Sequence, residues 1–524
     1  MADNVTETRP SQRPRNTIET KMMSVAEVAA QSRLLRQQGK IVVQCHGTFD
    51  LLHVGHVRHL EAARALGDVL VVTLTADRFV NKGPGRPVFT ETLRAEMLAA
   101  LDCVSFVAIA EASDAIDAIE NIRPSFYAKG MDYQNPDGDV TGKIVLERQA
   151  VEAHGGSVHF TDEIVLSSTE LINRHFNVFE PHVREHLHGL RDDGGLNEII
   201  DYIDRIKDYR VVLVGDAIID EYQYVLPMGK PPKEHIIATR YQDHETFAGG
   251  VFAAANHVAS FCREVHVITC LGTSSSYEDL IKRTLKPNVT LHALYRSNAP
   301  TTVKRRFVDP SSTRKLFEVY HMNDEPLTAD LEAQLEYKIG ALCPTADVVI
   351  STDFGHGLIG QRMVDRLVDT SPFLAVNTQS NSANMGYNLI TRYPQADYVC
   401  IDAPEARLAL SDRHSTAGDV IHRLADRLKD CPKIIVTQGR HGCISYERHG
   451  PVHTVPAVAR RVIDTVGAGD AFLAVTSPLV AAGAPMNLVA FVGNVVGALK
   501  VEIVGHRQSV EKAALIKAVT GLLK

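Results

Sequence analysis

Short apolar runs alternate with helix-like stretches along most of this chain, and this alternation limits its fold more than any other feature. In the first part, strand-like runs occur at 41–43, 69–74, 104–109 and 126–128, with helix-like stretches at 56–66, 91–101 and 112–122 between them. A second series has strand-like runs at 209–214, 265–269, 348–351, 374–377, 398–401 and 434–437. Repeated βα units form doubly wound parallel sheets. We therefore predict an α/β protein with two doubly wound domains.

The chain has 524 residues, which is too long for one ordinary hydrophobic core. Its polar start, 1–20, predicts a disordered tail. The first α/β series predicts a domain at 21–179. The segment 180–200 is rich in His, Asp, Glu and Gly and predicts a linker, which leaves 201–524 as the second domain.

Two intervals of the second domain, 223–241 and 301–320, look like strands without intervening helices. Such strands often build a small β lid beside a main sheet. The edges of a lid of this kind often pair between subunits, which favours a homodimer.

Composition narrows the class of protein. Hydrophobic residues make up 45% and charged residues 23% of the chain, as in soluble globular proteins. The formal charge of −8 gives no electrostatic reason to bind nucleic acid or an anionic membrane. The eight cysteines include no C-x-x-C pair, and the apolar stretch 471–504 is broken by Pro, Gly and Asn, which suits two buried helices. We expect a cytoplasmic protein.

The first chemical motif is Gly47-Thr48-Phe49-Asp50 after a predicted strand, followed by His53, Gly55 and His56 where a helix is expected to begin. A helix N-terminus offers free N–H groups and a positive dipole end to a phosphate. Residues three apart share a helix face, so both imidazoles can reach one phosphate, and Gly55 leaves room for the nucleotide. The motif predicts nucleotidyl transfer at the α-phosphate of a nucleoside triphosphate.

The segment 47–56 resembles the signature of the cytidylyltransferase-like nucleotidyltransferases. More closely, about 40–173 is similar to the nucleotidyltransferase half of the ADP-heptose synthase family. The similar pieces are Lys40, Lys82-Gly83, Arg86-Pro87-Val88, Lys129-Gly130-Met131-Asp132-Tyr133 and Ser167-Ser168-Thr169. The resemblance implies that Lys40 contacts the incoming phosphates. It also implies a nucleotide pocket lined by Gly47, Thr48, Phe49, Asp50, Gly55, Lys129, Ser168 and Thr169. ATP is the first choice for this half, with CTP as the alternative.

The second motif, 464–470, reads Asp-Thr-Val-Gly-Ala-Gly-Asp and precedes an apolar helix-like stretch. Small residues at a helix start expose backbone N–H groups, so Gly467, Ala468 and Gly469 predict an anion hole for a transferring phosphoryl group. Asp470 can accept the proton of an attacking hydroxyl. A carboxylate placed just ahead of an apolar helix is costly without such a use.

This motif resembles the signature of the ribokinase-like (PfkB) sugar kinases, and the resemblance extends over about 209–523. It implies that the sugar is held by Asp216, Asp220, Gly249, Gly250 and Asn256. It further implies that Lys304 and Arg306 meet anionic groups, including a phosphate already on the substrate. The adenine of ATP is expected beside Thr437, Gly439 and Gly442.

Two stretches depart from the pattern of the heptose kinases. Asn377-Thr378-Gln379-Ser380 stands where that family has Asp-Pro-Lys-Gly, and Asp402-Ala403-Pro404-Glu405 stands where it has Asn-x-x-Glu. In the family the second stretch is linked to Mg²⁺ and phosphate positioning. We therefore expect Asp402 and Glu405 near Mg²⁺, which would keep several waters and the substrate phosphates as ligands.

Together the halves look like an ADP-heptose synthase with the domain order reversed. The expected function is to phosphorylate heptose 7-phosphate or a similar sugar phosphate with MgATP, and then to couple the 1-phosphate to a nucleoside triphosphate. One alternative keeps the transferase and treats the second domain as altered or non-catalytic, because of the departures at 377–380 and Asp402. Another has a polyol or non-heptose acceptor. A non-enzymatic scaffold is disfavoured by two phosphate-binding turns.

Overall fold

The computed structural model describes residues 16–80, 86–131, 143–161, 179–229 and 235–524. The chain divides into two compact units, with the boundary between Val178 and Phe179. The N-terminal unit runs from 1 to 178, and the C-terminal unit runs from Phe179 to Leu523. Each unit contains its own sheet and its own hydrophobic core.

The N-terminal unit contains a five-stranded, wholly parallel sheet with the order β3-β2-β1-β4-β5. Its strands are β1 (Val42–Gly47), β2 (Val69–Thr75), β3 (Phe106–Ala110), β4 (Phe126–Gly130) and β5 (Ser157–Thr161). Its helices are α1 (Asn16–Glu19), α2 (Val25–Gln37), α3 (Val54–Arg64), α4 (Glu91–Ala99), α5 (Ile116–Ile122) and α6 (Lys143–Glu152). The short helix α1 forms where the sequence predicts the end of a disordered tail.

Helices cover both faces of this sheet. α2 and α5 pack on one face, where Val28, Ala118 and Ile122 share a cluster with β1 and β2. α3 and α4 pack on the other face through Leu60 and Leu98. The strand order runs outward from β1 to β3 and then restarts at β4, so β1 and β4 are neighbours at the point where the winding reverses. Ligands of open α/β sheets bind beyond the carboxyl ends of strands at such a point.

The C-terminal unit is built on a nine-stranded sheet with the order β10-β9-β6-β13-β14-β15-β16-β17-β18, parallel from β10 to β16. Its strands are β6 (Arg210–Gly215), β9 (Glu264–Gly272), β10 (Val289–Arg296), β13 (Val348–Asp353), β14 (Leu374–Thr378), β15 (Tyr398–Asp402), β16 (Lys433–Thr437), β17 (Cys443–Glu447) and β18 (His453–Val455). The last two strands pair antiparallel.

Two helical layers sandwich the large sheet. One layer is α8 (Pro181–Asp192), α9 (Gly195–Arg205), α10 (Val251–Ala259), α16 (Ala468–Ala481), α17 (Met486–Lys500) and α18 (Lys512–Leu523). The other is α12 (Ala329–Leu342), α13 (Gln361–Thr370), α14 (Ala403–Leu410) and α15 (Ala417–Arg427). A short helix, α11 (Glu278–Thr284), lies between β9 and β10 in the chain.

The apolar stretch 471–504 is confirmed as two buried helices, α16 and α17. No helix in the described ranges is long and apolar enough to cross a membrane.

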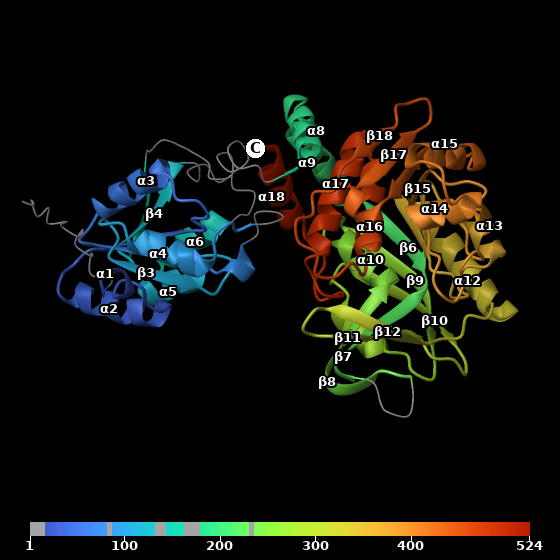
Figure 1. The fold of residues 1–524 in the computed structure, drawn as a ribbon, viewed down its shortest axis with the longest axis horizontal. Helices are drawn as coiled ribbons and strands as arrows, with labels where there is room; N and C mark the ends of the chain where they lie inside the picture. Colours follow the sequence, from blue (N-terminus) through green and yellow to red (C-terminus); the bar gives the residue numbers. More distant parts are fainter. Residues whose placement is uncertain (1–15, 81–85, 132–142, 162–178, 230–234) are drawn as a thin grey trace, which may run out of the picture. The chain divides into compact units, whose positions relative to one another are not determined.

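A separate four-stranded sheet forms the lid that the sequence predicts, with the order β12-β11-β7-β8. Its strands are β7 (Ala217–Gly229), β8 (Ala238–Gly250), β11 (Thr302–Asp309) and β12 (Arg314–His321). Figure 1 shows this sheet gathered at one end of the C-terminal unit, beside the large sheet. β7 follows β6 with only Asp216 between them, so the lid begins at the carboxyl edge of the large sheet.

The segment 180–200, predicted as a linker, is instead helical and belongs to the C-terminal unit. Val183, Leu187 and Leu190 of α8 and Ile199 and Ile203 of α9 are buried in the core beneath α17 and α18. The spacing of these residues gives each helix an apolar face. The many His, Asp and Glu residues between them obscured that face in the sequence.

Candidate functional site

The first candidate site lies where β1 ends and α3 begins. His53 is the N-cap residue of α3, and the rings of His53 and His56 stack with their centroids 3.9 Å apart. Phe49 has a left-handed backbone (φ 48°), and a Cβ atom at Gly47 would lie 3.2 Å from its ring. The helix start therefore presents two adjacent imidazoles beside its N-terminal backbone N–H groups.

Lys129 reaches the same edge of the sheet from β4. β4 pairs with β1 in parallel, with Ala128 opposite Cys45, so Lys129 and Gly130 lie at the carboxyl end next to the Gly47 loop. Nζ of Lys129 forms an ion pair of 2.9 Å with Glu147 of α6, and both side chains are buried or nearly so. This pairing holds the ammonium at the crevice between β1 and β4. His59, whose Nδ1 lies 2.6 Å from Oγ1 of Thr161, has its pKa lowered to about 4 by burial and by Lys129.

Asp50 supports the loop from below. Its side chain is fully buried and forms an ion pair with Arg86, whose side chain is only 6% exposed. It also accepts a hydrogen bond of 2.5 Å from the backbone N–H of Val88. Both carboxylate oxygens are therefore engaged with the 86–88 segment. The predicted contact between Asp50 and the nucleotide is replaced by a structural role, because the charge already has a buried partner.

Lys40 does not belong to this site. It precedes β1, whereas Gly47 ends it, and seven residues of strand span roughly 20 Å. Its side chain is 50% exposed and pairs with Asp68 at 3.2 Å. The prediction that Lys40 contacts phosphates is wrong, because the amino and carboxyl ends of a strand lie at opposite edges of the sheet. The predicted pocket residues Ser168 and Thr169 lie outside the described residues, as do Lys82 and Gly83.

The second candidate site centres on the turn 464–470, which leads into α16. Gly467 is the N-cap of α16 with φ 74°, and the helix begins at Ala468. Asp464 fixes the start of the turn, because it accepts hydrogen bonds from the hydroxyl of Tyr222 (2.6 Å), Nζ of Lys315 (2.7 Å) and the backbone N–H of Gly505 (2.8 Å). The N–H groups of the turn are thus held in place at the positive end of a 14-residue helix.

Lys500 braces the same turn from α17. Its side chain is fully buried, and Nζ donates to the carbonyl oxygens of Val466 (2.8 Å) and Gly505 (2.7 Å). Burial lowers the pKa of Lys500 to about 8. A charged side chain inside the core is costly, so its two carbonyl contacts and the nearby carboxylates must compensate for the lost water.

Asp470 is buried in the first turn of α16, and burial raises the pKa of its carboxyl above the ordinary value. Its Oδ1 accepts a hydrogen bond of 2.9 Å from Nε2 of Gln379, the residue after β14. Gln379 is one of the positions that depart from the heptose kinases. Here it fixes the orientation of the carboxylate and leaves Oδ2 as the oxygen that can take a proton.

Asp220 forms the centre of a buried charge cluster on β7. It pairs with Arg306 of β11, and its Oδ2 lies 3.1 Å from Nε2 of His506. Burial alone would raise the pKa of Asp220, but Arg306 and His506 lower it below the ordinary value. Arg306 also reaches Glu318 at 3.4 Å. The cluster brings the lid strands to the turn at Gly467, because a Cβ atom at that glycine would lie 2.5 Å from the His506 ring.

Lys304 is a buried cation on strand β11 of the lid, next to the second candidate site. It is only 7% exposed, and its Nζ lies over the rings of Tyr320 (5.4 Å) and Phe354 (5.7 Å). In the described part of the chain it forms no ion pair, whereas Arg306 has two. Burial lowers the pKa of Lys304. A buried ammonium between aromatic rings is suited to an anionic ligand.

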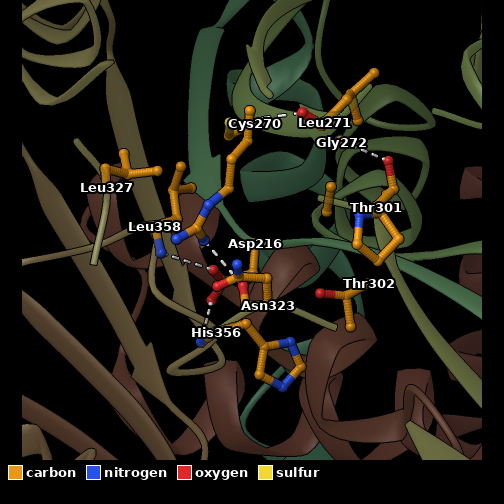
Figure 2. A pocket seen from close by; sticks show the side chains of 13 residues that line it. Asp216, Cys270, Leu271, Gly272, Thr301, Thr302, Asn323, Leu327, His356 and Leu358 are labelled. Carbon is orange, nitrogen blue, oxygen red and sulfur yellow. Dashed lines mark hydrogen bonds between the residues drawn. The ribbon is translucent and has the colours of Figure 1, made fainter. Parts of the chain in front are cut away.

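Asp216 holds a loop together. Its carboxylate accepts hydrogen bonds from the backbone N–H groups of Phe354 (3.0 Å), His356 (3.3 Å) and Leu358 (3.2 Å). Figure 2 shows the hydrogen bonds of His356 and Leu358 to Asp216 at the wall of a pocket that all three residues line. Burial, and then the nearby Asp353, raise the pKa of Asp216 to about 7. Three donors already occupy the carboxylate that was predicted to bind sugar, so its role is to shape the loop after β13.

Among the other predicted sugar contacts, the two glycines adjoin the site, whereas Asn256 is engaged elsewhere in the protein. Gly249 leaves space for Asp220, because a Cβ atom there would lie 1.9 Å from Oδ2 of that carboxylate. Gly250 has φ 53°. Asn256, in contrast, accepts from the N–H of Lys286 and donates to the carbonyl of Thr284, each at 2.9 Å. In the structure the amide of Asn256 anchors the loop after α11, and its contact with the sugar stays a prediction.

Asp402 and Glu405 form the N-terminal capping box of α14. Oε2 of Glu405 accepts from the N–H of Asp402 (2.8 Å), Oε1 accepts from the N–H of Ser380 (3.1 Å), and Oδ1 of Asp402 accepts from the N–H of Ala403 (2.8 Å). Burial raises the pKa of Glu405 to about 7. Within the described ranges, no group of three or more His, Cys, Asp or Glu side chains could hold a metal ion. Two carboxylates fit Mg²⁺ only where phosphates and water supply the other ligands.

The residues predicted beside adenine lie at the end of β16. Thr437 is opposite Asp402 in the register of β15 and β16, and Gly439 begins the short turn that follows. Gly442 has φ 88°, and a Cβ atom there would lie 2.0 Å from the carbonyl oxygen of Val455. The glycines therefore allow a close turn between β16 and β17 at the same carboxyl edge as Gln379 and Asp402.

Sequence reasoning missed Lys500 and His506 and assigned no role to Gln379. Lys500 and His506 lie near the chain end, in and after a helix that reads as pure core. The only signal was a lysine and a histidine beside an otherwise apolar stretch, and its meaning depends on contacts with Val466 and Asp220, which are distant in the sequence.

Comparison with known proteins agrees with this geometry. The pfkB family of carbohydrate kinases matches residues 208–513, which is more than half of the chain. The chain belongs to the pfkB carbohydrate kinase family. Residues 44–174 match the cytidylyltransferase-like family, so the transferase-like unit precedes the kinase unit.

Curated relatives match one part of the chain. A bifunctional protein HldE from Syntrophotalea carbinolica is 40% identical over 148 residues, which cover 28% of this chain and 29% of that protein. Another, from Citrifermentans bemidjiense, is 44% identical over 137 residues, or 26% of this chain and 27% of that protein. These matches span less than a third of the relatives' length. A solved ribokinase from Arabidopsis thaliana, with ribose and ATP, is 17% identical, with a TM-score of 0.47 over 60% of this chain and 99% of that one.

Proposed function

We propose that the protein makes a nucleotide-activated sugar in two steps. The C-terminal unit transfers the γ-phosphate of ATP to the anomeric hydroxyl of heptose 7-phosphate or a similar sugar phosphate, which gives ADP and a sugar that carries both a new 1-phosphate and its original phosphate. The N-terminal unit then joins the 1-phosphate to the α-phosphate of ATP and releases pyrophosphate. The observation that carries this proposal is the pair of phosphate-binding helix starts, each with its own reactive side chains, in a chain that matches both families.

In the kinase step, the N–H groups at 467–470 hold the transferring phosphoryl group, whose growing negative charge lies at the start of α16. Asp470 takes the proton of the attacking hydroxyl on Oδ2. Lys304 binds the phosphate already on the sugar, because it is a buried ammonium with aromatic neighbours and without an ion pair among the described residues.

Mg²⁺ would be held near Asp402 and Glu405 mainly by ATP phosphates and water, since each carboxylate already accepts backbone N–H groups. When bound, the ion neutralises phosphate charge and orients the triphosphate. Thr437 and Gly439 border the adenine at the neighbouring strand end.

In the transferase step, His53 and His56 donate to the α-phosphate oxygens from one face of α3, and Lys129 supplies positive charge from β4. Since the Lys129 loop resembles that of the ADP-heptose synthase family, ATP is the proposed second substrate and CTP is the alternative.

The decisive experiment incubates the protein with heptose 7-phosphate, Mg²⁺ and either ATP or CTP, and identifies the products by mass spectrometry. We expect sugar 1,7-bisphosphate and a nucleotide-linked sugar with ATP. Asp470→Asn should abolish the first product, while supplied 1,7-bisphosphate should still be converted. His56→Ala should still form the 1,7-bisphosphate but should no longer convert it to the nucleotide-linked sugar.

A protein in which the C-terminal unit is non-catalytic is the competing function, favoured by the altered residues Gln379 and Asp402. It predicts that ATP consumption with sugar phosphate present is the same in Asp470→Asn as in the unaltered protein. If another sugar or polyol phosphate gave a product and heptose 7-phosphate did not, the proposed substrate would change while the two-step reaction would stand.

A further inference from the structure

His506 has an unusual place between the lid and the phosphoryl-transfer turn. It follows α17 in the chain, its side chain is only 5% exposed, and its Nε2 lies 3.1 Å from Oδ2 of Asp220. The opposite edge of the ring lies against Gly467, where a Cβ atom would stand 2.5 Å from Cε1 and 3.2 Å from Nδ1. One imidazole therefore touches both a lid carboxylate and the start of α16.

The position of the ring is fixed by the backbone around it. Gly505 donates its N–H to Asp464 at 2.8 Å, and its carbonyl accepts from Lys500 at 2.7 Å. On the other side, Arg507 pairs with Glu245 at 2.6 Å. Both neighbours anchor the backbone at His506, and turning the ring away from the site would break its buried contact with Asp220.

The contact with Asp220 determines which nitrogen of the His506 ring carries a proton. The pKa of Asp220 is held low by Arg306 and His506, so its carboxylate is ionised and can only accept. Nε2 of His506 must then donate, and in the neutral form of the imidazole Nδ1 carries a lone pair that can accept. Nδ1 is buried, and it has no hydrogen-bond partner among the residues that the structure describes. An acceptor that is buried without a donor destabilises the site until a donor reaches it.

The chemistry of the two substrates decides which can supply that donor. Ionised phosphate oxygens of ATP only accept hydrogen bonds, whereas a sugar hydroxyl can donate. We propose that Nδ1 of His506 accepts a hydrogen bond from a hydroxyl of the acceptor sugar, next to the hydroxyl that is phosphorylated. His506 is thus a sugar-reading residue of the kinase unit, and Asp220 acts on the sugar through it.

This inference rests on the proposed kinase function and is tested by pairing variants with substrate analogues. Kinase kcat and KM are measured for heptose 7-phosphate and for a panel of its monodeoxy analogues, in the unaltered protein, His506→Ala and His506→Gln. In the unaltered protein, loss of one particular hydroxyl should lower kcat/KM by about tenfold or more. In His506→Ala that same analogue should lose almost nothing relative to the full sugar, because the acceptor is already gone.

Two further readouts separate sugar reading from a structural role. His506→Gln can donate to Asp220 and still accept through its amide oxygen, so it should recover part of the discrimination. The KM for ATP should be unchanged in both variants, while the KM for the sugar rises. Arg507→Gln is the matched control, since it alters a surface ion pair in the same loop and should keep the preference for the hydroxyl.

Three results would overturn the proposal: equal penalties for every analogue in the unaltered protein and in His506→Ala, a rise in the KM for ATP alone, or the same loss of discrimination in Arg507→Gln. Folding of each variant is checked by thermal unfolding and by the transferase activity of the same chain. If the unaltered protein shows no ATP consumption that depends on the sugar phosphate, the proposed kinase function fails first, which distinguishes the two failures.

Discussion

At the residue scale, existing contacts determine which polar side chains remain for a ligand. Asp216 lies between β6 and β7, and Asp220 lies four residues later on β7. The carboxylate of Asp216 is saturated by backbone N–H groups, whereas that of Asp220 faces Arg306 and His506. Lys304 and Arg306 are two residues apart on β11, yet only Arg306 has carboxylate partners among the residues described. The two members of each pair carry charge of the same sign, so the residue type alone does not distinguish them. Their burial and their hydrogen-bond and ion-pair partners do.

Gln379 should control the pH dependence of the kinase. Asp470 must be ionised to take a proton, so kcat falls as pH falls through the pKa of its carboxyl. Gln379→Leu removes a donor to the carboxylate, which raises that pKa and moves the acid limb of kcat to higher pH. Gln379→Lys places a cation there and should move the limb to lower pH. Profiles of kcat against pH measure both shifts, and an unmoved limb in both variants would contradict the role of this contact.

Glu405 should make stability depend on pH in a predictable direction. The pKa of Glu405 is raised from 4.5 to about 7 by burial, so ionisation costs the folded state more than the unfolded one. Its contribution to the unfolding free energy is greatest below pH 4.5 and is lost as pH rises through about 7.

Glu405→Gln cannot ionise, so its unfolding free energy should fall less over this pH range. Urea denaturation at pH 5 and pH 8 measures the difference between the two proteins. A difference that is the same at both pH values would show that ionisation of Glu405 is not responsible.

At the element scale, both candidate sites use a tight turn that leads into a helix start. In the N-terminal unit this is the turn between β1 and α3, and in the C-terminal unit it is the turn before α16. In each case a buried charge supports the turn from behind, Asp50 in the first and Lys500 in the second. The binding groups are backbone N–H atoms, so the stability of the turn and its chemistry are linked.

Substitution of Asp50 should therefore reduce stability and transferase activity far more than substitution of Lys40. Asp50→Asn removes the charge that pairs with buried Arg86 and should destabilise the N-terminal unit by on the order of 3 kcal/mol. Lys40→Ala removes an exposed pair and should cost less than about 1 kcal/mol.

Transferase activity should be reduced in Asp50→Asn and retained in Lys40→Ala. Denaturation of the isolated variants and pyrophosphate release measure both effects. A large loss of activity in a fully folded Lys40→Ala would restore the role that the sequence predicted for this lysine.

At the scale of the whole molecule, α8 and α9 determine where the kinase unit begins. They extend the helical layer formed by α10, α16, α17 and α18, and Arg191 of α8 donates to the carbonyl of Leu523 at 2.9 Å. Asp204 of α9 pairs with Lys512 at 2.7 Å. The start and the end of the unit are thus packed together.

Two truncations test this boundary. The chain 179–524 should be folded and should consume ATP with the sugar phosphate, because it retains the complete core. The chain 207–524 lacks α8 and α9, exposes the apolar surface that Ile199 and Ile203 cover, and should aggregate or unfold at lower temperature. Circular dichroism and size-exclusion chromatography compare them. Equal stability of the two chains would mean that the helices are an independent linker.

The sequence alone determined the two α/β units, the lid, the two helix-start motifs and their order, because hydrophobic periodicity and glycine-rich turns are local properties of the chain. Only the tertiary structure decided that Lys40 lies at the wrong end of β1, that Asn256 anchors a loop, and that His506 reaches Asp220. These outcomes depend on which strand ends meet and which charges find partners across hundreds of residues. Burial and pairing are properties of the packed chain, and no local pattern carries them.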